Sequence, residues 1–344
     1  MLPIGVFDHL DQGNVPLSEY YETRFKLIEA FERSGFYAYH VAEHHFTPLG
    51  MAPSPSVYLA AIAQRTKRLR FGPLVYALPL YHPLRLIQEI CMLDQISCGR
   101  LEIGFGRGAS SIEASYYDQR AAQEIYEEGL ALVLEGLRSK VLNFEGKTFR
   151  FKDVPLALEP FQKPHPPLWY GVHSVESAAR AARQGLNVVN FELAHDARAV
   201  SDSYRQAWRE SHGNAALPKN GLLRFVFVAA DDETALNIAR RAYLEWHRSF
   251  HFLFHLHGSA PRTGPRAPDF DGVMAQGRGI AGSPNTVARF LREQMIETRC
   301  NYLVGQFAFG DLTLSEMLQS VDLFTRHVMP EMDRLLADQD GPIP

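Results

Sequence analysis

The sequence lacks the features that mark secreted, membrane-spanning and disulfide-stabilised proteins. No apolar run approaches the roughly 20 residues needed to cross a bilayer. The first residues, MLPIGVFDHLDQ, have neither the basic region nor the apolar core of a signal peptide. Cysteine is scarce, with 3 in 344 residues. These absences predict a protein that does not enter a membrane and that works in the reducing cytoplasm.

The three cysteines and the charge balance exclude further classes of site and partner. Cys91, Cys98 and Cys300 provide neither a disulfide framework nor the paired spacing of a metal site, so we expect all three to pack in the core. The 35 basic and 39 acidic residues give a net charge of −4 and form no basic tract. Nucleic acid and anionic membranes are therefore not expected as partners.

The sequence does contain a regular alternation of short apolar strands and amphipathic helices. The 46% apolar content is that of an ordinary soluble protein, and 344 residues suit one large domain or two smaller ones. We expect one domain over residues 1–344. Eight strands alternating with helices predict a (β/α)8 TIM barrel. A doubly wound open sheet is the competing architecture, but its G-x-G-x-x-G fingerprint is absent after the first strand. The expected strands cover residues 4–7, 36–42, 69–78, 101–105, 168–172, 186–191, 222–229 and 301–307.

Two segments break this alternation and are expected to be insertions in the barrel. Near residues 141–156, phenylalanines flank Glu145-Gly146-Lys147, which is the pattern of a β-hairpin. Residues 255–282 are rich in glycine and proline and show no period, which predicts a long irregular, lid-like loop. A single long helix is expected over residues 116–140, because apolar and acidic side chains alternate there at helical spacing.

The stretch 79–108, PLYHPLRLIQEICMLDQISCGRLEIGFGRG, reads as a helix and a buried strand that ends in Gly106-Arg107-Gly108. Barrels bind ligands at the carboxyl ends of their strands. The forked guanidinium of Arg107 suits phosphate, and flanking glycines let backbone N–H groups approach an anion. Ser174, which opens the helix after the fifth strand, could add a hydroxyl and helix N-terminal amides. The pair of elements predicts a phosphorylated ligand, with a surface ion pair as the alternative role of Arg107.

Histidines gather at the same predicted face of the barrel. Glu43-His44-His45 follows the second strand, and Asp8-His9 follows the first. Three interpretations compete for Glu43-His44-His45: an acid–base histidine, a zinc or iron site, and a polar strand end held by hydrogen bonds. Adjacent residues on a strand point to opposite sides, which weakens the metal interpretation. The residues alone leave the other two interpretations open.

Three segments resemble the bacterial luciferase-like, flavin-dependent monooxygenases. They are AEHHFTPLG at 42–50, LPLYHPLRL at 78–86 and LDQISCGRLEIGFGRG at 93–108. The similarity continues through GVHSVESAARAARQGLNVV at 171–189 and, more weakly, towards residue 330. The family fold is a (β/α)8 barrel with insertions, in agreement with the strand count.

The resemblance implies a function and a set of partners. It implies a monooxygenase that uses reduced FMN (FMNH2) and dioxygen and oxidises a small organic substrate through a flavin C4a-(hydro)peroxide. A separate flavin reductase would supply the FMNH2, and the protein would be a homodimer, with the helices at 57–64 and 84–96 as candidate contacts. A deazaflavin-dependent oxidoreductase on the same barrel and a non-catalytic flavin-binding protein are the alternatives.

The resemblance also implies roles for particular residues. His44 matches the catalytic histidine of the luciferase α subunit, and Arg107, followed by Gly108, matches the arginine that holds the FMN phosphate. Ser174 and Ser177 fall where helix-start residues bind that phosphate, and His173 stands beside them in place of a glutamate. Leu74-Val75 falls where luciferase has a non-prolyl cis peptide beside the flavin ring. No metal is implied.

Besides His173, two further positions depart from the luciferase pattern. Gly106 stands where luciferase has a reactive cysteine, and Phe307 stands where it has an acidic residue on the eighth strand. These departures argue against light emission from a long-chain aldehyde. They favour hydroxylation or Baeyer–Villiger oxidation of another small molecule.

Overall fold

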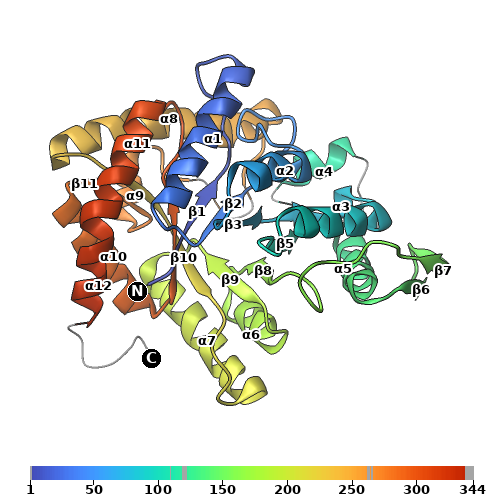
Figure 1. Cartoon of the computed structure of the whole chain (residues 1–344). Coiled ribbons are helices and arrows are strands. Elements are labelled where there is room, and N and C mark those ends of the chain that lie inside the picture. The colour runs from blue at the N-terminus through green and yellow to red at the C-terminus, as the bar shows by residue number, and fades with distance from the viewer. Residues whose placement is uncertain (1, 109, 118–121, 262–263, 265, 338–344) are drawn as a thin grey trace.

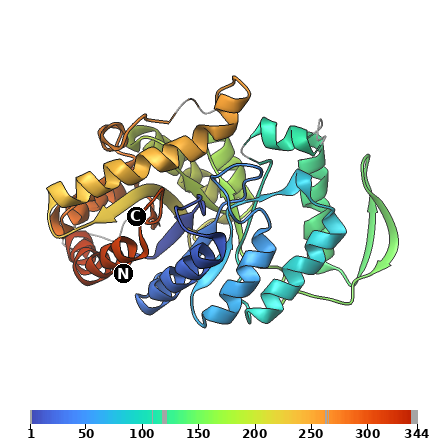
Figure 2. The same ribbon diagram turned by 90° about the horizontal axis from the view of Figure 1, so that it is seen from above.

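Parallel strands occupy the centre of the molecule in the computed structural model, and helices surround them (Figures 1 and 2). The structure describes residues 2–108, 110–117, 122–261, 264 and 266–337. The central strands are short and almost entirely buried, as expected where helices cover the outside of a parallel barrel. The predicted α/β TIM-barrel fold is thereby confirmed.

Each strand of the barrel pairs with its neighbours in parallel, in the order β3-β2-β1-β12-β10-β9-β8-β5-β4, and β11 pairs with β10. The strands are β1 (Ile4–Asp8), β2 (Ala38–Val41), β3 (Arg70–Pro73), β4 (Tyr76–Ala77), β5 (Ile103–Gly106), β8 (Leu168–Gly171), β9 (Asn187–Asn190), β10 (Asn220–Val228), β11 (Gly279–Gly282) and β12 (Tyr302–Gln306). The strand predicted over 69–78 is divided into β3, which pairs with β2, and β4, which pairs with β5. Leu74 and Val75, which are joined by a cis peptide bond, lie between the two.

The barrel closes where β3 meets the start of β5. Phe71 forms a parallel bridge with Leu101, and β4 then pairs with β5. Gly72 makes this approach feasible, because a Cβ atom there would lie 1.7 Å from the carbonyl oxygen of Glu102. The carboxyl ends of the strands are thus brought to a single mouth.

Helices follow the strands and cover the barrel. They are α1 (Leu17–Arg33), α2 (Pro55–Arg65), η1 (Leu78–Leu80), α3 (Pro83–Ile96), α6 (Val175–Arg183), α7 (Ala194–His212), α8 (Asp232–Leu256), α10 (Pro284–Thr298), α11 (Leu314–Leu323), the π-helical η2 (Phe324–Val328) and α12 (Met329–Ala337). No helix in the described part of the chain is both long enough and apolar enough to cross a membrane.

The predicted hairpin is present as β6 (Val141–Glu145) and β7 (Arg150–Pro155), which project from the side of the barrel (Figure 2). It follows α5 (Ala122–Arg138), and the Glu128 carboxylate of α5 accepts backbone N–H groups from the hairpin turn. A short helix, α4 (Ser111–Tyr116), precedes α5 and was not predicted. Residues 118–121 of the expected helix lie outside the described residues.

The prediction of an irregular loop over residues 255–282 is wrong at both ends of the segment. Helix α8 continues to Leu256, and the second half contains α9 (Phe270–Ala275) and strand β11. This strand was not predicted because glycine has a low strand propensity. The structure nevertheless requires glycine at position 279, since a Cβ atom there would lie 2.8 Å from the Cβ of Phe225 on β10. An irregular stretch remains between His257 and Asp269, of which residues 262, 263 and 265 lie outside the described residues.

The core prediction holds for two of the three cysteines. Cys91 and Cys300 are buried, whereas Cys98 is exposed. The expectation for Cys98 is wrong because this residue follows the end of α3 with a φ of 54°, in the turn that leads to β5.

A buried charge cluster fixes the chain where it leaves β1. The Arg24 guanidinium of α1 lies 3.7 Å from Asp8 Oδ2 and 3.6 Å from Asp11 Oδ1, and all three side chains are buried. Asp8 also accepts hydrogen bonds from the Tyr39 hydroxyl (2.9 Å) and from the backbone N–H of Leu10 (2.8 Å). This cluster determines the path of the loop that carries His9.

We expect Arg24→Met to lower the free energy of unfolding by about 3–5 kcal/mol, because it leaves two buried carboxylates without their cation. Urea denaturation followed by circular dichroism measures the change. Arg33→Met, an exposed position on the same helix, should stay within about 0.5 kcal/mol of the parent. Equal effects of the two substitutions would show that the cluster does not stabilise the fold.

Candidate active site

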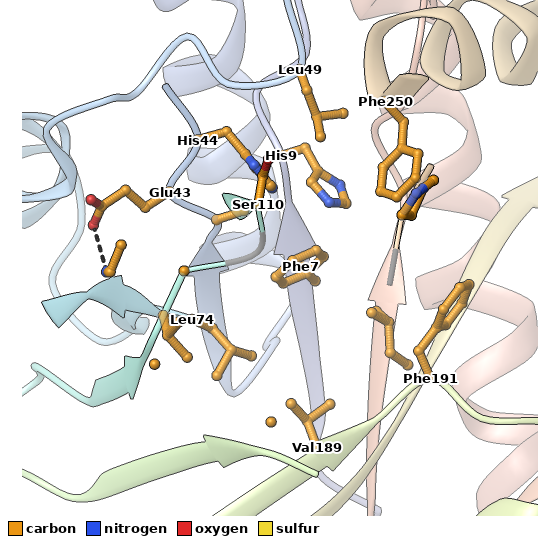
Figure 3. A pocket seen from close by; sticks show the side chains of 18 of the residues that line it. Phe7, His9, Glu43, His44, Leu49, Leu74, Ser110, Val189, Phe191 and Phe250 are labelled. Atoms are coloured by element: carbon orange, nitrogen blue, oxygen red, sulfur yellow. Dashed lines mark hydrogen bonds between the residues drawn. The ribbon is translucent and has the colours of Figure 1, made fainter. Parts of the chain in front are cut away.

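A pocket of about 470 Å³ opens at the carboxyl ends of the strands (Figure 3). Its floor is apolar and consists of Phe7, Leu74 and Val189, which pack together inside the barrel. One wall comes from α8, through side chains that include Trp246 and Phe250. Polar groups line the remaining walls: His9, Glu43, His44, Arg107, Ser110, Glu113, His173, Asn190, Arg266 and Gln306. The arrangement is that of a small-molecule site with a few convergent polar groups.

His44 enters this pocket from the chain after β2 (Figure 3). Its Nδ1 lies 3.2 Å from Oε1 of Glu113, and Oε2 of Glu113 accepts the backbone N–H of His45 at 2.7 Å. Because an ionised carboxylate only accepts hydrogen bonds, Nδ1 of His44 carries the hydrogen. The Nε2 atom is left without a hydrogen-bond partner in the described structure, and as an acceptor it can take a proton from a ligand.

His45 points away from His44 and does not line the pocket. Its Nε2 lies 2.8 Å from Oε1 of Glu43, and Tyr117 lies 3.0 Å from its Nδ1. The other oxygen of Glu43 accepts the backbone N–H of Ala77 and the hydroxyl of Tyr81. The two histidines therefore have separate partners. Among the described residues, no three His, Cys, Asp or Glu side chains are grouped so that they could hold a metal ion.

His9 is a pocket residue to which the sequence assigned no role. Its Nδ1 lies 3.4 Å from the indole nitrogen of Trp246 and 3.1 Å from the side-chain amide of Gln306. An indole N–H only donates, so Nδ1 is the acceptor and the hydrogen of the neutral ring is on Nε2. Burial lowers the pKa of His9 well below its usual value, and the neighbouring His44 and Arg266 lower it further.

The two imidazoles lie close together with complementary hydrogen-bonding capacity. The ring centroids of His9 and His44 are 5.7 Å apart, and the rings are inclined by 29°. His44 has an accepting Nε2 and His9 has a donating Nε2–H, each as a consequence of the partner at Nδ1. The site can thus accept a proton at one ring and donate a hydrogen bond from the other.

The predicted phosphate residues lie at the ends of β5 and β8. Arg107 is exposed and has no hydrogen bond or ion pair with any side chain that the structure describes. Gly108 has a φ of 88°, and a Cβ atom on Gly171 would meet nothing within 4 Å. A guanidinium beside two bare stretches of backbone leaves room for an anionic group. His173 lies at this end of the pocket, with its Nδ1 3.1 Å from Glu192.

Ser174 and Ser177 lie at the start of α6 and do not line the pocket. They form a capping box, in which Ser174 Oγ accepts the N–H of Ser177 at 3.2 Å and Ser177 Oγ accepts the N–H of Ser174 at 3.1 Å. Their hydroxyl groups are thus already used to cap the helix. The structure brings them to the same corner as His173 but not into contact with Arg107.

Leu74 and Val75, which the cis peptide joins, both line the pocket. Val75 also explains why position 106 carries no side chain. A Cβ atom on Gly106 would lie 2.4 Å from a methyl group of Val75, so this side chain occupies the space that another residue at 106 would need.

Comparison with known proteins identifies the family of this chain. A family model described as luciferase-like monooxygenase matches residues 2–300. The chain belongs to the luciferase-like monooxygenase family. An uncharacterised protein of Sinorhizobium fredii is 42% identical over 321 residues, which are 92% of this chain and 93% of that protein. The oxygenase component of a flavin-dependent trigonelline monooxygenase from Acinetobacter baylyi is 29% identical over 223 residues, covering 62% and 61% of the two chains.

Several solved structures share the fold of the present chain. A monooxygenase from Streptomyces bottropensis has a TM-score of 0.86 at 23% identity, covering 96% of this chain and 99% of the other. The oxygenating constituent of 3,6-diketocamphane monooxygenase from Pseudomonas putida, solved with FMN, has a TM-score of 0.80 at 20% identity and the same coverage. A coenzyme F420-dependent tetrahydromethanopterin reductase from Methanopyrus kandleri has a TM-score of 0.69 at 16% identity, again over 96% and 99%.

The hydrogen-bond partners and the burial of His9 predict which ring nitrogen carries the hydrogen and that the ring stays neutral near pH 7. The ¹⁵N resonances of a histidine-labelled sample should show an unprotonated Nδ1 and a protonated Nε2 at pH 7, with no protonation of His9 between pH 8 and 6. Since the unfolded chain protonates this ring near pH 6.5 and the folded one does not, the free energy of unfolding should fall as the pH drops below about 6.5. A His9 signal that titrates near pH 6.5 would contradict this assignment.

Proposed function

We propose that this protein is an FMNH2- and dioxygen-dependent monooxygenase that acts on a small organic substrate. The observation that carries the proposal is the pocket itself: an uncompensated arginine beside bare backbone at one end, and two imidazoles of opposite hydrogen-bonding capacity over an apolar floor. Family membership supports the reaction class. The trigonelline monooxygenase relative is flavin-dependent, and one structural neighbour was solved with FMN.

The end of the pocket at β5 and β8 fits a flavin phosphate. Arg107 would form charge-assisted hydrogen bonds to it, and Gly108 would let the backbone approach. Ser174 and Ser177 would contribute through the start of α6 rather than through free hydroxyl groups, since these are used in the cap. His173 lies beside them. Leu74 and Val75, which line the pocket, would offer apolar contacts to the flat ring system.

The bound flavin would supply an activated oxygen atom, as the C4a-(hydro)peroxide that the family resemblance implies. The residues of this chain would supply proton management and exclusion of water. His44 would accept or return a proton at Nε2, and Glu113 would keep its ring in the required tautomer. His9 would donate a hydrogen bond from Nε2. Trp246, Phe250 and the adjacent apolar side chains of α8 would limit the entry of water.

We propose two protein partners, a flavin reductase and a second copy of this chain. One relative is named as an oxygenase component, which supports a separate reductase as the source of FMNH2. A homodimer through α2 and α3 is supported by large apolar side chains exposed on these helices, namely Val57 (73%), Met92 (51%) and Ile96 (42%).

A deazaflavin-dependent oxidoreductase is the second candidate, because one structural neighbour depends on coenzyme F420. Comparing the affinities for reduced FMN and reduced deazaflavin distinguishes the two candidates. Oxygen uptake coupled to loss of a substrate would exclude a non-catalytic flavin-binding protein.

Anaerobic titration with reduced flavins tests the phosphate site. Arg107→Ala should weaken FMNH2 binding by about 10- to 100-fold, the worth of a charge-assisted hydrogen bond, and leave reduced riboflavin unchanged. Arg85→Ala, an exposed arginine on α3, is the control and should affect neither ligand. Absence of FMNH2 binding to the parent protein at high micromolar concentration would refute the proposed function. Equal weakening of both flavins in Arg107→Ala would place the phosphate elsewhere.

Single-turnover measurements test the role of His44. His44→Ala should bind FMNH2 normally and lose product formation by about 100- to 10,000-fold, the usual contribution of an acid–base group. His195→Ala, on the exposed surface of α7, serves as the matched control. If His44→Ala formed product as fast as the parent protein, His44 would have no role in the mechanism.

A further inference from the structure

The pocket contains a second cation that forms no ion pair in the described structure, on a different wall from the predicted phosphate site. Arg266 lines the pocket just before α9, and its guanidinium carbon lies 5.3 Å from the ring centre of Phe191 and 5.1 Å from that of Phe250. Both rings lie across the pocket from Glu43 and Leu74 (Figure 3). Phe191 follows β9, which is separated from β5 by β8, so Arg266 and Arg107 are held by different parts of the barrel.

No carboxylate in the described structure forms an ion pair with Arg266. The nearby Arg278 also lies over Phe191, at 5.3 Å, but it has Glu192 at 3.7 Å and donates to the carbonyl oxygen of Phe191 at 3.1 Å. Burial lowers the pKa of Arg266 and Arg278 lowers it further, whereas Tyr243 and Glu192 act in the opposite direction. Glu192 forms its ion pairs with Arg278 and His173, and the arginine remains charged near neutrality. Arg266 is half-buried, and two aromatic faces and a carboxylate that forms no ion pair with it compensate its charge only partly.

The acidic groups of the pocket are not available to Arg266. Glu43 already binds His45, Tyr81 and the Ala77 N–H, and Glu113 binds His44 and the His45 N–H. The charge of Arg266 is nevertheless felt inside the pocket, since it contributes to the lowered pKa of His9. Phe250, over which Arg266 lies, stacks on Trp246, and the indole nitrogen of Trp246 is 3.4 Å from Nδ1 of His9. A ligand anion at Arg266 would therefore lie on the His9 side of the pocket.

We propose that Arg266 binds a carboxylate group of the organic substrate and so selects anionic substrates. This inference rests on the proposed function, because it assigns the substrate class of the same site. A guanidinium offers a planar edge of paired N–H donors, which matches the two oxygens of a carboxylate. Phe191, Phe250 and Trp246 provide apolar surface for the rest of the molecule. The carboxylate would hold the substrate at one end and present its other end to His44 and the flavin.

Calorimetric titration of matched carboxylate and carboxamide pairs tests this proposal. The probes are benzoate and benzamide, phenylacetate and phenylacetamide, and octanoate and octanamide, each measured anaerobically with FMNH2-loaded and with flavin-free protein. In at least one pair the carboxylate should bind about 30-fold more tightly than the amide, equivalent to about 2 kcal/mol. No carboxylate preference in any pair would overturn the proposal.

Substitutions of Arg266 test whether this side chain causes the carboxylate preference. Arg266→Met keeps an apolar stem over the two rings and should abolish the preference, whereas Arg266→Lys keeps the charge without the planar edge and should retain part of it. Arg248→Met, an exposed arginine on α8 that pairs with Glu245, should bind all probes like the parent. A preference that survives in Arg266→Met would overturn the proposal.

The flavin titrations separate this proposal from the proposed function. Arg266→Met should bind FMNH2 and reduced riboflavin like the parent. Selective loss of FMNH2 binding in this variant would instead assign Arg266 to the flavin phosphate and overturn the carboxylate site. If the parent protein binds no FMNH2, the monooxygenase proposal fails, while the carboxylate preference is still measured on the flavin-free protein.

Discussion

Closure of the barrel between β3 and β5 is the constraint on which the rest of the structure depends. The backbone N–H of Phe71 donates to Arg100, and the N–H of Glu102 donates to Phe71, so the sheet has no gap at this seam. Only glycine at position 72 permits these backbones to approach so closely. Once the seam is closed, every strand directs its carboxyl end to one mouth, and residues far apart in sequence become neighbours.

The chemistry at this mouth is set by the partners of the histidines more than by the histidines themselves. A carboxylate at Nδ1 makes His44 an acceptor at Nε2, whereas an indole N–H at Nδ1 makes His9 a donor. Two identical side chains thereby acquire opposite capacities within one small space. A third histidine, His45, does not line the pocket, because both of its ring nitrogens are hydrogen-bonded to Glu43 and Tyr117. The partner of each ring, rather than residue type, distinguishes the groups available for catalysis from those that hold the loop.

The sequence predicted the barrel and the hairpin, because these follow from local periodicity and turn composition. It also predicted that His44 and His45 would not face one ligand, but β2 ends at Val41, so their separate partners rather than strand alternation keep them apart. It could not predict the partners of His9, since Trp246 and Gln306 are 237 and 297 residues away in the chain. Strand β11 was missed because its glycines have low strand propensity, although packing against β10 requires them. Arg266 was hidden for a similar reason, in a segment whose composition suggested only a loop. Tertiary contacts override local signals at each of these positions.

Charge compensation separates the side chains that maintain the pocket from those left for ligands. Glu43 and Glu113 accept hydrogen bonds from the protein at both oxygens, and Arg278 has Glu192 nearby. Arg107 and Arg266 form no ion pair in the described part of the chain, and they belong to different walls. A single anionic ligand would leave one of them uncompensated. On the proposed function, the flavin and the substrate would each bring one anionic group to one of these arginines, and their uncharged parts would meet over the apolar floor beside His9.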